Sequence, residues 1–176
     1  MNTFEAEILK LLHSVFSCEV LDFIFKFISH LGDKGAIWIV LSVALIIFPK
    51  TRKAGICSAI SLILCLAVGN IMLKPMFGRV RPYDFDTSIK IIIPPLHDGS
   101  FPSGHTMAAF ASMHSIAKCF RRYRLYLYTA ASLMGLSRIY LCVHYPTDVI
   151  FGSLFGICFA IAAHKTYNIL TKGRKM

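Results

Sequence analysis

Charged residues are scarce in this sequence. They make up 16% of its 176 residues, whereas a soluble globular domain carries about a quarter. Hydrophobic residues account for 56%, and the mean hydropathy is +0.62. This balance excludes an ordinary soluble domain and predicts one integral membrane domain over residues 1–176, without a soluble appendage.

Several other features are missing, and each absence narrows the class of protein. The six cysteines form no CxxC pair, so they are interpreted as small apolar residues rather than as a redox or zinc site. No cluster of carboxylates, or of Cys and His, has metal-ligand spacing, so we expect no metal and no cofactor. The stretch MNTFEAEILK has two acids before its first lysine, which is unlike a basic secretory signal.

Apolar runs are the most prominent feature that the sequence does contain. Residues 54–73 carry no charge, and residues 125–143 carry only Arg138. Shorter runs are extended by weakly polar flanks toward the roughly 17–25 residues that a membrane span needs; they lie at 35–48, 106–117 and 149–163. A sixth segment, about 15–31, contains three charges, and an interfacial position is the alternative for it. We therefore expect an all-α fold, a polytopic membrane bundle of about six transmembrane helices.

Basic residues are concentrated in three segments that contain no acid, 50–53, 118–124 and 165–175. They follow the second, fourth and sixth predicted spans, so six spans put all three on one side of the membrane. The positive-inside rule assigns that side to the cytoplasm, together with both termini. The net charge of +10 is therefore attributed to topology and to anionic membrane lipids, and not to nucleic acid.

The opposite ends of the spans hold polar residues of both signs and the long connection 82–101, a length that is more often functional than idle. The first motif there is KPMFGRVRP, residues 74–82. If this segment is helical, the seven residues from Lys74 to Arg81 make two turns and place both cations on one face about 10 Å apart. Such a pair suits a phosphate. Snorkelling of both side chains at the membrane interface is the alternative.

The second motif, FPSGH, lies directly ahead of an apolar run. Pro102 ends any preceding element, Ser103 is a natural N-cap, and Gly104 lets the backbone approach a ligand. A helix that starts near His105 would offer free N–H donors and the positive end of its dipole to an anion. A serine cap with an interfacial histidine is the competing interpretation.

The third motif is SRIYLCVHYPTD, residues 137–148. Arg138 lies within an apolar span, where a charge is costly and usually functional. Because proline favours the first helical position, the last span is predicted to start at Pro146. Asp148 in its first turn can then reach back to His144, fix the tautomer of the imidazole and make its free nitrogen more nucleophilic. A purely structural His–Asp pair is the alternative.

The three motifs gain meaning together, because all lie at the same membrane face. They supply three cations, a helix N-terminus, a histidine with a carboxylate and a second histidine. This is the inventory for phosphoryl transfer through a covalent phosphohistidine. The other histidines are interpreted as interfacial or packing residues; they are His13, His30, His97, His114 and His164.

With these motifs the sequence resembles the type 2 phosphatidic acid phosphatase superfamily, whose three-part signature is K-x6-R-P, then P-S-G-H, then S-R-x5-H-x3-D. All three parts are complete and in order over residues 74–148. The resemblance implies that His144 is the nucleophile, that Asp148 orients it, and that His105 acts as general acid and then as general base. It also implies a set of phosphate ligands, namely Lys74, Arg81, Ser103, Gly104 and Arg138. Arg79 and Tyr83 lie outside the signature and receive no catalytic role.

The resemblance also implies a metal-independent membrane lipid phosphatase whose partners are a lipid phosphate and the surrounding membrane lipids. The expected location is the cell membrane, multi-pass, with an extracytoplasmic active site. Undecaprenyl diphosphate is the favoured substrate; phosphatidylglycerophosphate, phosphatidate and lipid A phosphates are the alternatives. A haloperoxidase would share the anion pocket but is usually soluble, and a transporter or scaffold with a vestigial pocket would lack one of the two histidines. The sequence carries no signal for an oligomeric state.

Overall fold

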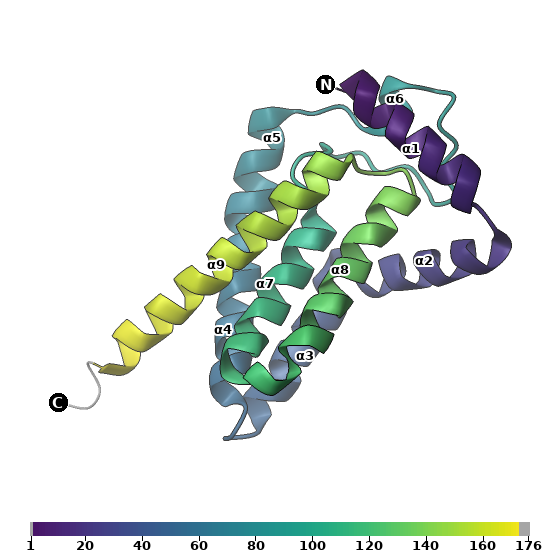
Figure 1. Ribbon diagram of the computed structural model, residues 1–176. Helices are drawn as coiled ribbons and strands as arrows, with labels where there is room; N and C mark the ends of the chain where they lie inside the picture. Colours follow the sequence, from purple (N-terminus) through teal and green to yellow (C-terminus); the bar gives the residue numbers. More distant parts are fainter. Residues whose placement is uncertain (1, 173–176) are drawn as a thin grey trace.

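The computed structural model describes residues 2–172, and within this range the chain is helical without any strand. The all-α prediction is therefore confirmed for this range. The longer helices, labelled in Figure 1, are α1 (Asn2–Phe16), α2 (Glu19–Leu31), α3 (Ala36–Ile47), α4 (Arg52–Leu64), α7 (Gly104–Cys119), α8 (Arg124–Tyr140) and α9 (Pro146–Lys172). The shorter elements are η1 (Asp33–Gly35), the π-helical η2 (Cys65–Leu73), α5 (Lys74–Phe77), α6 (Pro82–Phe85) and η3 (Arg121–Tyr123).

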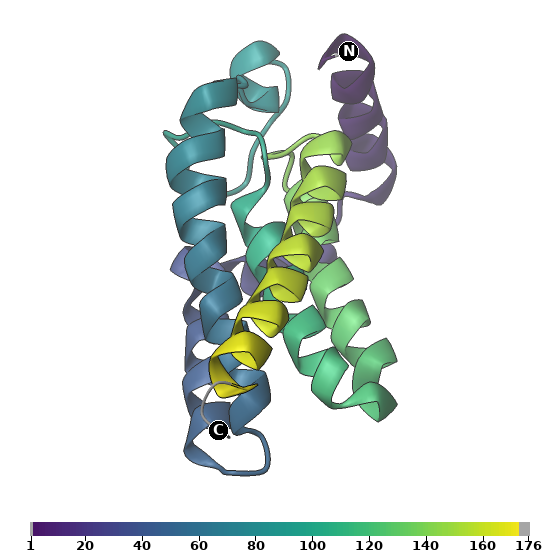
Figure 2. The same ribbon diagram turned by 90° about the vertical axis from the view of Figure 1, so that its left-hand side faces the viewer.

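Helix α7 is the centre of the bundle and packs mainly on α9, α8 and α4 (Figures 1 and 2). Two glycines of α9 allow its close approach to α7. A Cβ at Gly156 would lie 2.4 Å from the carbonyl oxygen of Met107, and one at Gly152 would lie 2.8 Å from that of Ser103. Small residues let backbones approach closely in membrane bundles, where dispersion replaces the hydrophobic effect between helices. This packing fixes the start of α7 against the start of α9.

The helices differ in whether they are long and apolar enough to cross a membrane. Two stretches are long and apolar enough to span a bilayer, Arg52–Phe85 and Pro146–Thr171. A third results if the pair Glu19–Leu31 and Asp33–Ile47, bent by 44°, is one broken span. Helices α7 and α8 have 16 and 17 residues, which at about 1.5 Å per residue gives roughly 24–26 Å. The chain is thus an integral membrane protein by its long apolar helices, and the count of six spans stays a prediction.

The predicted segment 15–31 does not form one helix. Helix α1 ends at Phe16, and Cys18 is extended (φ −153°, ψ 154°) before α2 begins at Glu19. The break lets α2 run at a steep angle to the main bundle, and it leaves α1 across one end of the molecule beside α6 (Figure 1). Helix α1 buries Ala6 and Leu9 in a cluster that includes Val143 and Tyr145, so it covers the turn between α8 and α9.

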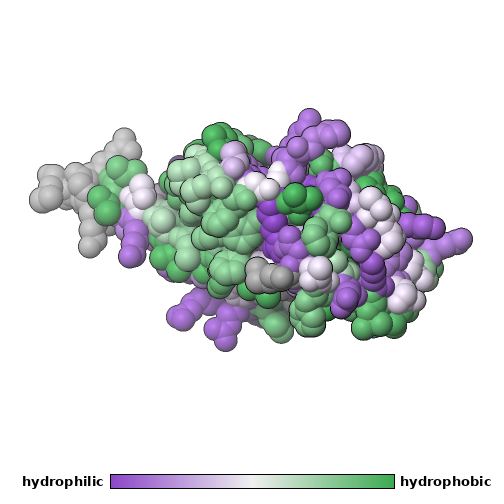
Figure 3. All heavy atoms as spheres, turned by 90° about the horizontal axis from the view of Figure 1, so that it is seen from above, coloured by the Kyte–Doolittle hydropathy of each residue, from purple (hydrophilic) through white to green (hydrophobic). Residues whose placement is uncertain are grey.

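The end of the bundle beneath α1 is where the polar loops gather. Seen from above, hydrophilic side chains collect between apolar surfaces on this face (Figure 3). The long connection from α6 to α7 crosses here, and the Tyr83 hydroxyl both donates to the carbonyl oxygen of Leu96 (3.0 Å) and accepts from its N–H (2.9 Å). Tyr83 therefore fixes this connection, and with it the residues that precede α7.

Candidate active site

Five charged or titratable side chains are buried together at this end of the bundle. Their exposed fractions are 7% for Lys74, 2% for Arg81, 1% for Arg138, 1% for His144 and 0% for Asp148. Burial of a charge is costly unless it is paired or bound to a ligand. The fold therefore gathers the residues of the first and third motifs, which are about 60 residues apart in sequence, into one buried polar cluster.

His144 lies in the turn between α8 and α9. Its Nε2 is 3.5 Å from Nη1 of Arg81, and its Nδ1 is 3.6 Å from Oδ2 of Asp148. The second distance exceeds that of an ordinary hydrogen bond. The carboxylate thus faces Nδ1, and Nε2 is the ring nitrogen that faces the cations.

Burial lowers the pKa of His144 to about 3, although the neighbouring Asp148 carboxylate acts to raise it. Arg81 and Arg138 add to the lowering, because two cations disfavour a third charge beside them. The imidazole is therefore neutral across the physiological pH range, which is the protonation state that a nucleophilic nitrogen requires.

Three donors surround the Asp148 carboxylate. Arg79 donates to Oδ1 at 2.6 Å, while the Ser100 hydroxyl and the N–H of Tyr145 donate to Oδ2 at 2.5 and 2.9 Å. The Ser100 hydroxyl also lies 3.5 Å from Nδ1 of His144. These contacts fix Asp148 as an oriented anion beside the imidazole.

Arg79, which the motif spacing left without a role, links this carboxylate to the N-terminal helix. Its guanidinium bonds to Glu5 at 2.5 Å and stacks 4.0 Å above the Tyr145 ring. Glu5 in turn accepts from both the N–H and the hydroxyl of Thr147, at 3.0 and 2.7 Å. Glu5 lies at a distance of 142 residues from Thr147, so no local pattern in the sequence could have identified it. A charged residue between Lys74 and Arg81 was the available signal for Arg79.

Lys74 and Arg81 do converge, but not by the predicted helical geometry. Helix α5 ends at Phe77, and Gly78 adopts a left-handed conformation (φ 50°, ψ 27°) that turns the chain, so the two-turn helix prediction is wrong. Both cations instead bond to Asp98: Lys74 to Oδ2, and Arg81 to Oδ1 at 2.6 Å. Burial would raise the pKa of the Asp98 carboxyl, but the two cations lower it to about 2.

Arg138 is buried near the end of α8 with much of its hydrogen-bonding capacity unused. One terminal nitrogen donates to the Ser29 hydroxyl of α2. Among the described residues 2–172, its Nε and its other terminal nitrogen have no partner. A buried guanidinium with two free donors is unfavourable by itself, and it fits a site that receives an anion.

The start of α7 differs in detail from the expected serine cap. Ser103 occupies the N-cap position with extended backbone, but its hydroxyl bonds to that of Thr106 at 2.9 Å and not to a backbone N–H. Its own N–H donates to the carbonyl oxygen of Asp148 at 3.1 Å, which ties the starts of α7 and α9 together. The first N–H groups of a helix lack partners within it. The groups at the start of α7 that could bind an anion, as predicted, are therefore backbone N–H donors. Gly104 faces Asn70, whose Oδ1 would lie 2.9 Å from an added Cβ.

His105 follows in the first turn of α7 and bonds to a residue that the motifs did not identify. Its Nε2 lies 3.1 Å from Oδ1 of Asp33, in the turn between α2 and α3. Asp33 is 72 positions away in sequence. The one available signal was its place among the polar residues at the same ends of the predicted spans.

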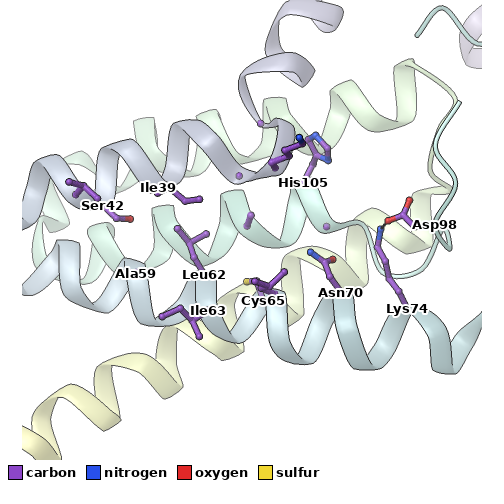
Figure 4. Close-up of a pocket in the computed structure, with 17 residues that line it drawn as sticks. Ile39, Ser42, Ala59, Leu62, Ile63, Cys65, Asn70, Lys74, Asp98 and His105 are labelled. Atoms are coloured by element: carbon purple, nitrogen blue, oxygen red, sulfur yellow. Dashed lines mark hydrogen bonds and ion pairs between the residues drawn. The ribbon is translucent and has the colours of Figure 1, made fainter. Parts of the chain in front are cut away.

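An apolar groove of about 600 Å³ leads from this cluster along the bundle. Figure 4 shows Lys74, Asp98 and His105 at one end of it and Ile39, Leu62 and Ile63 toward the other. The groove runs between α3, α4 with η2, and α7. It therefore joins a charged end to an apolar one, a shape that suits an amphipathic molecule.

A sequence model described as the PAP2 superfamily matches residues 54–172, which is more than half of the chain. The chain belongs to the PAP2 superfamily. The matched PAP2 region contains all eight residues that the motifs nominated, whereas Glu5 and Asp33 lie before it. No group of three or more His, Cys, Asp or Glu side chains with metal-binding geometry occurs among residues 2–172.

Two curated relatives illustrate the kinds of PAP2 protein that this chain is similar to. It is 32% identical over 131 residues to an undecaprenyl-diphosphatase of Sulfolobus acidocaldarius, covering 74% of this chain and 63% of the relative. It is 34% identical over 151 residues to the undecaprenyl-diphosphatase BcrC of Bacillus subtilis, covering 84% of this chain and 76% of the relative. The chain thus spans less than two thirds of the Sulfolobus acidocaldarius relative.

A solved structure supports the PAP2 fold. The crystal structure of a transmembrane PAP2 type phosphatidylglycerolphosphate phosphatase from Bacillus subtilis superposes with a TM-score of 0.74. The superposition covers 94% of this chain and 85% of the other, at 23% sequence identity. At this identity the likeness concerns the fold, and the arrangement of helices described above is therefore that of a PAP2 membrane protein.

Proposed function

We propose that the protein is a metal-independent membrane lipid phosphatase that works through a phosphohistidine on His144. The observation that carries this proposal is the buried cluster of three cations, Lys74, Arg81 and Arg138, around a neutral imidazole. Within residues 2–172, two nitrogens of Arg138 have no hydrogen-bond partner, and they can donate to an incoming phosphate. Placing cations where charge develops is the largest usual contribution to catalysis of this kind.

In the first step Nε2 of His144 attacks phosphorus and the bond from phosphorus to the leaving oxygen breaks. Nδ1 faces Asp148, so its proton is directed to a carboxylate that three other donors orient. Lys74, Arg81 and Arg138, with the backbone at Ser103 and Gly104, bind the other phosphate oxygens. His105 gives its proton to the leaving oxygen.

In the second step water attacks the phosphohistidine and the bond between phosphorus and nitrogen breaks. His105, now neutral, takes one proton from the attacking water and is ready for the next cycle. Orthophosphate leaves and His144 is again neutral. The two steps together hydrolyse one phosphate ester or anhydride without a cofactor.

The substrate is proposed to be a lipid because the groove continues the site along the bundle. Its apolar end suits a hydrocarbon chain, and its charged end is formed by Lys74, Asp98 and His105. Undecaprenyl diphosphate is the favoured substrate, and two relatives that carry the name undecaprenyl-diphosphatase support this choice. Phosphatidylglycerophosphate, phosphatidate and lipid A phosphates are the alternatives.

The proposed topology places the site on the extracytoplasmic side of the cell membrane and the C-terminal end of α9 on the cytoplasmic side. The expected cytoplasmic N-terminus does not fit this arrangement, because Glu5 of α1 bonds to Arg79 and to Thr147 at the site end of the bundle. The acid-free basic segments 50–53 and 118–124, together with the described part of 165–175, lie at the opposite end of the bundle and support this orientation. Helices α7 and α8 then cross as short spans, which local thinning of the bilayer accommodates at modest cost.

The test is a panel of lipid phosphates and diphosphates, ranked by kcat/KM for the protein in detergent with and without EDTA. The proposal expects turnover of at least one lipid phosphate, unaffected by EDTA and abolished in His144→Ala. It expects undecaprenyl diphosphate to rank first. Turnover that survives in His144→Ala, or that EDTA removes, would contradict the mechanism.

A further inference from the structure

Asp33 bridges two histidines at the edge of the site. Its Oδ1 lies 3.1 Å from Nε2 of His105, and its Oδ2 lies 2.8 Å from Nδ1 of His30. The two rings differ sharply in environment, because the side chain of His105 is 18% exposed and that of His30 is 84% exposed. Asp33 thus connects an imidazole inside the site with one at the surface.

The turn that carries Asp33 is packed against the His105 ring. A Cβ at Gly32 would lie 2.9 Å from Cδ2 of His105, so the backbone before Asp33 leaves no room for a larger residue. After Asp33 the chain turns through two left-handed residues, Lys34 (φ 54°) and Gly35 (φ 73°), before α3 begins. This geometry aims the carboxylate at the ring and limits the ring's rotation.

Charged groups from three other elements face His105. Asp33 approaches from η1, Arg138 from α8 and Lys74 from α5. Both cations oppose a positive charge on the imidazole, and a bound phosphate would be shared among them. The Asp33 carboxylate is the group that bonds directly to the ring and favours its protonated form.

We propose that Asp33 is a positioning residue that aims His105 as the general acid and favours its protonated form against the burial and the cations that oppose it. This inference rests on the proposed function, in which His105 must carry a proton when the leaving oxygen departs. With Nε2–H donating to Asp33, Nδ1–H is the proton that is transferred. Each histidine of the site thus has a carboxylate partner. Asp33 favours the charged form of the general acid His105, whereas Asp148 orients the neutral nucleophile His144.

The decisive variant is Asp33→Asn, which keeps the size and a hydrogen-bonding oxygen but removes the charge. Its matched control is His30→Gln, which removes the other partner of Asp33 at the exposed side. The first readout is NMR titration of the His105 imidazole in detergent, which needs no substrate. In Asp33→Asn the ring is expected to lose its proton at a pH lower by about one unit or more, while His30→Gln leaves the titration close to that of the wild type.

The second readout is the pH profile of kcat on the best substrate of the lipid panel. Asp33→Asn is expected to lower kcat at neutral pH by about tenfold to a hundredfold, as for partial loss of a general acid, and to shift the alkaline limb to lower pH. Asp33→Glu, which retains the charge, is expected to recover part of the rate. If Asp33→Asn does not fold, the proposal still requires Asp33→Glu to keep the wild-type alkaline limb.

Different results would overturn the function of His144 and the role of Asp33. Turnover by His144→Ala would overturn the proposed phosphohistidine function and leave the titration of His105 as it was measured. An unchanged His105 titration and an unshifted alkaline limb in folded Asp33→Asn would overturn the role of Asp33 alone. A uniform loss of rate without a pH shift would assign Asp33 a purely structural role and also contradict the proposal.

Discussion

At the scale of single residues, two of the three cations of the site share one carboxylate, that of Asp98. Asp98 bonds to both Lys74 and Arg81, yet its own side chain is 55% exposed while theirs are 9% and 2% exposed. A carboxylate at the mouth of the site can therefore yield to a phosphate that carries more charge. We expect Lys74 and Arg81 to keep their positions when a phosphate displaces Asp98, because their side chains are buried.

We predict that Asp98→Asn binds orthophosphate more tightly than the wild type. Removing the competing carboxylate at a half-exposed position is worth up to about 1 kcal/mol, or roughly a factor of five in affinity. The measurement is the inhibition constant of orthophosphate against lipid phosphate hydrolysis, with Asp84→Asn as a control for a general change of charge. Weaker inhibition in Asp98→Asn would mean that Asp98 positions Arg81 and does not compete with the ligand.

The buried His144 makes stability depend on pH in a defined direction. Its folded pKa of about 3 lies below the ordinary value of about 6.5, so the unfolded chain binds the proton first as the pH falls. This contribution to stability is full above about pH 6.5 and is lost progressively toward pH 3. The thermal midpoint in detergent should therefore fall less steeply across this window in His144→Asn than in the wild type. Parallel curves would contradict a neutral, buried His144.

The sequence predicted the site residues that belong to short motifs. It did not predict the residues that reach the site from distant parts of the sequence. His144 and Asp148 are four residues apart and face each other, so their pairing follows from the spacing around Pro146. Asp33 and Glu5 acquire their partners only through the packing of α1 and α2 on the bundle. Physical reasoning on one sequence has no access to such contacts.

At the scale of elements, α1 is tied to the site by one buried acid. Glu5 accepts from Thr147 at the start of α9 and from Arg79, which in turn bonds to Asp148. The helix therefore contributes to the orientation of a carboxylate that it never touches. The neighbouring Ala6 and Leu9 hold α1 in place, because they are buried in one cluster with Ile89, Val143 and Tyr145.

We predict that Glu5→Gln lowers both stability and kcat while leaving KM nearly unchanged. The loss of a charged hydrogen bond at a buried site costs about 1.5–3 kcal/mol, and Arg79 is then free to shift on Asp148. The thermal midpoint and the kinetic constants in detergent give the answer, with the exposed Glu7→Gln on the same helix as the matched control. Equal effects of the two substitutions would contradict a specific link through Glu5.

Helix boundaries were predictable where a proline marks the start of a helix. They were not predictable where contacts with the rest of the fold determine the boundary. Pro146 begins α9 as expected, because proline fits the first helical position. The helix expected between Lys74 and Arg81 ends at Phe77, since Gly78 adopts the left-handed conformation. The apolar run 15–31 is divided at Cys18, a break that no proline or glycine announced.

At the scale of the whole molecule, the orientation in the membrane is the main prediction. The acid-free basic segments 50–53 and 118–124, and the described part of 165–175, lie away from the catalytic cluster, which fits a cytoplasmic end opposite an extracytoplasmic site. In a background with the six native cysteines replaced, a cysteine at position 98 should react with a membrane-impermeant maleimide in intact cells. A cysteine at position 122 should react only after permeabilisation, and the reverse pattern would contradict the topology.

The class of molecule was easier to predict than its shape. Hydropathy alone indicated an all-helical membrane protein, because a bilayer leaves few other ways to satisfy backbone hydrogen bonds. It did not predict that α7 and α8 would be as short as 16 and 17 residues. Nor did it predict the groove between α3, η2 and α7, since cavities arise from packing between helices and not from any one of them.

The covalent intermediate on His144 can be trapped and identified directly as a phosphoenzyme. The protein in detergent is mixed with a lipid phosphate labelled with ³²P in the scissile group, quenched in alkali within milliseconds and digested. We predict label that is stable in alkali and labile in acid, on the peptide containing His144, and none in His144→Ala. Turnover of the same substrate with no label on that peptide, or with label retained in His144→Ala, would contradict it.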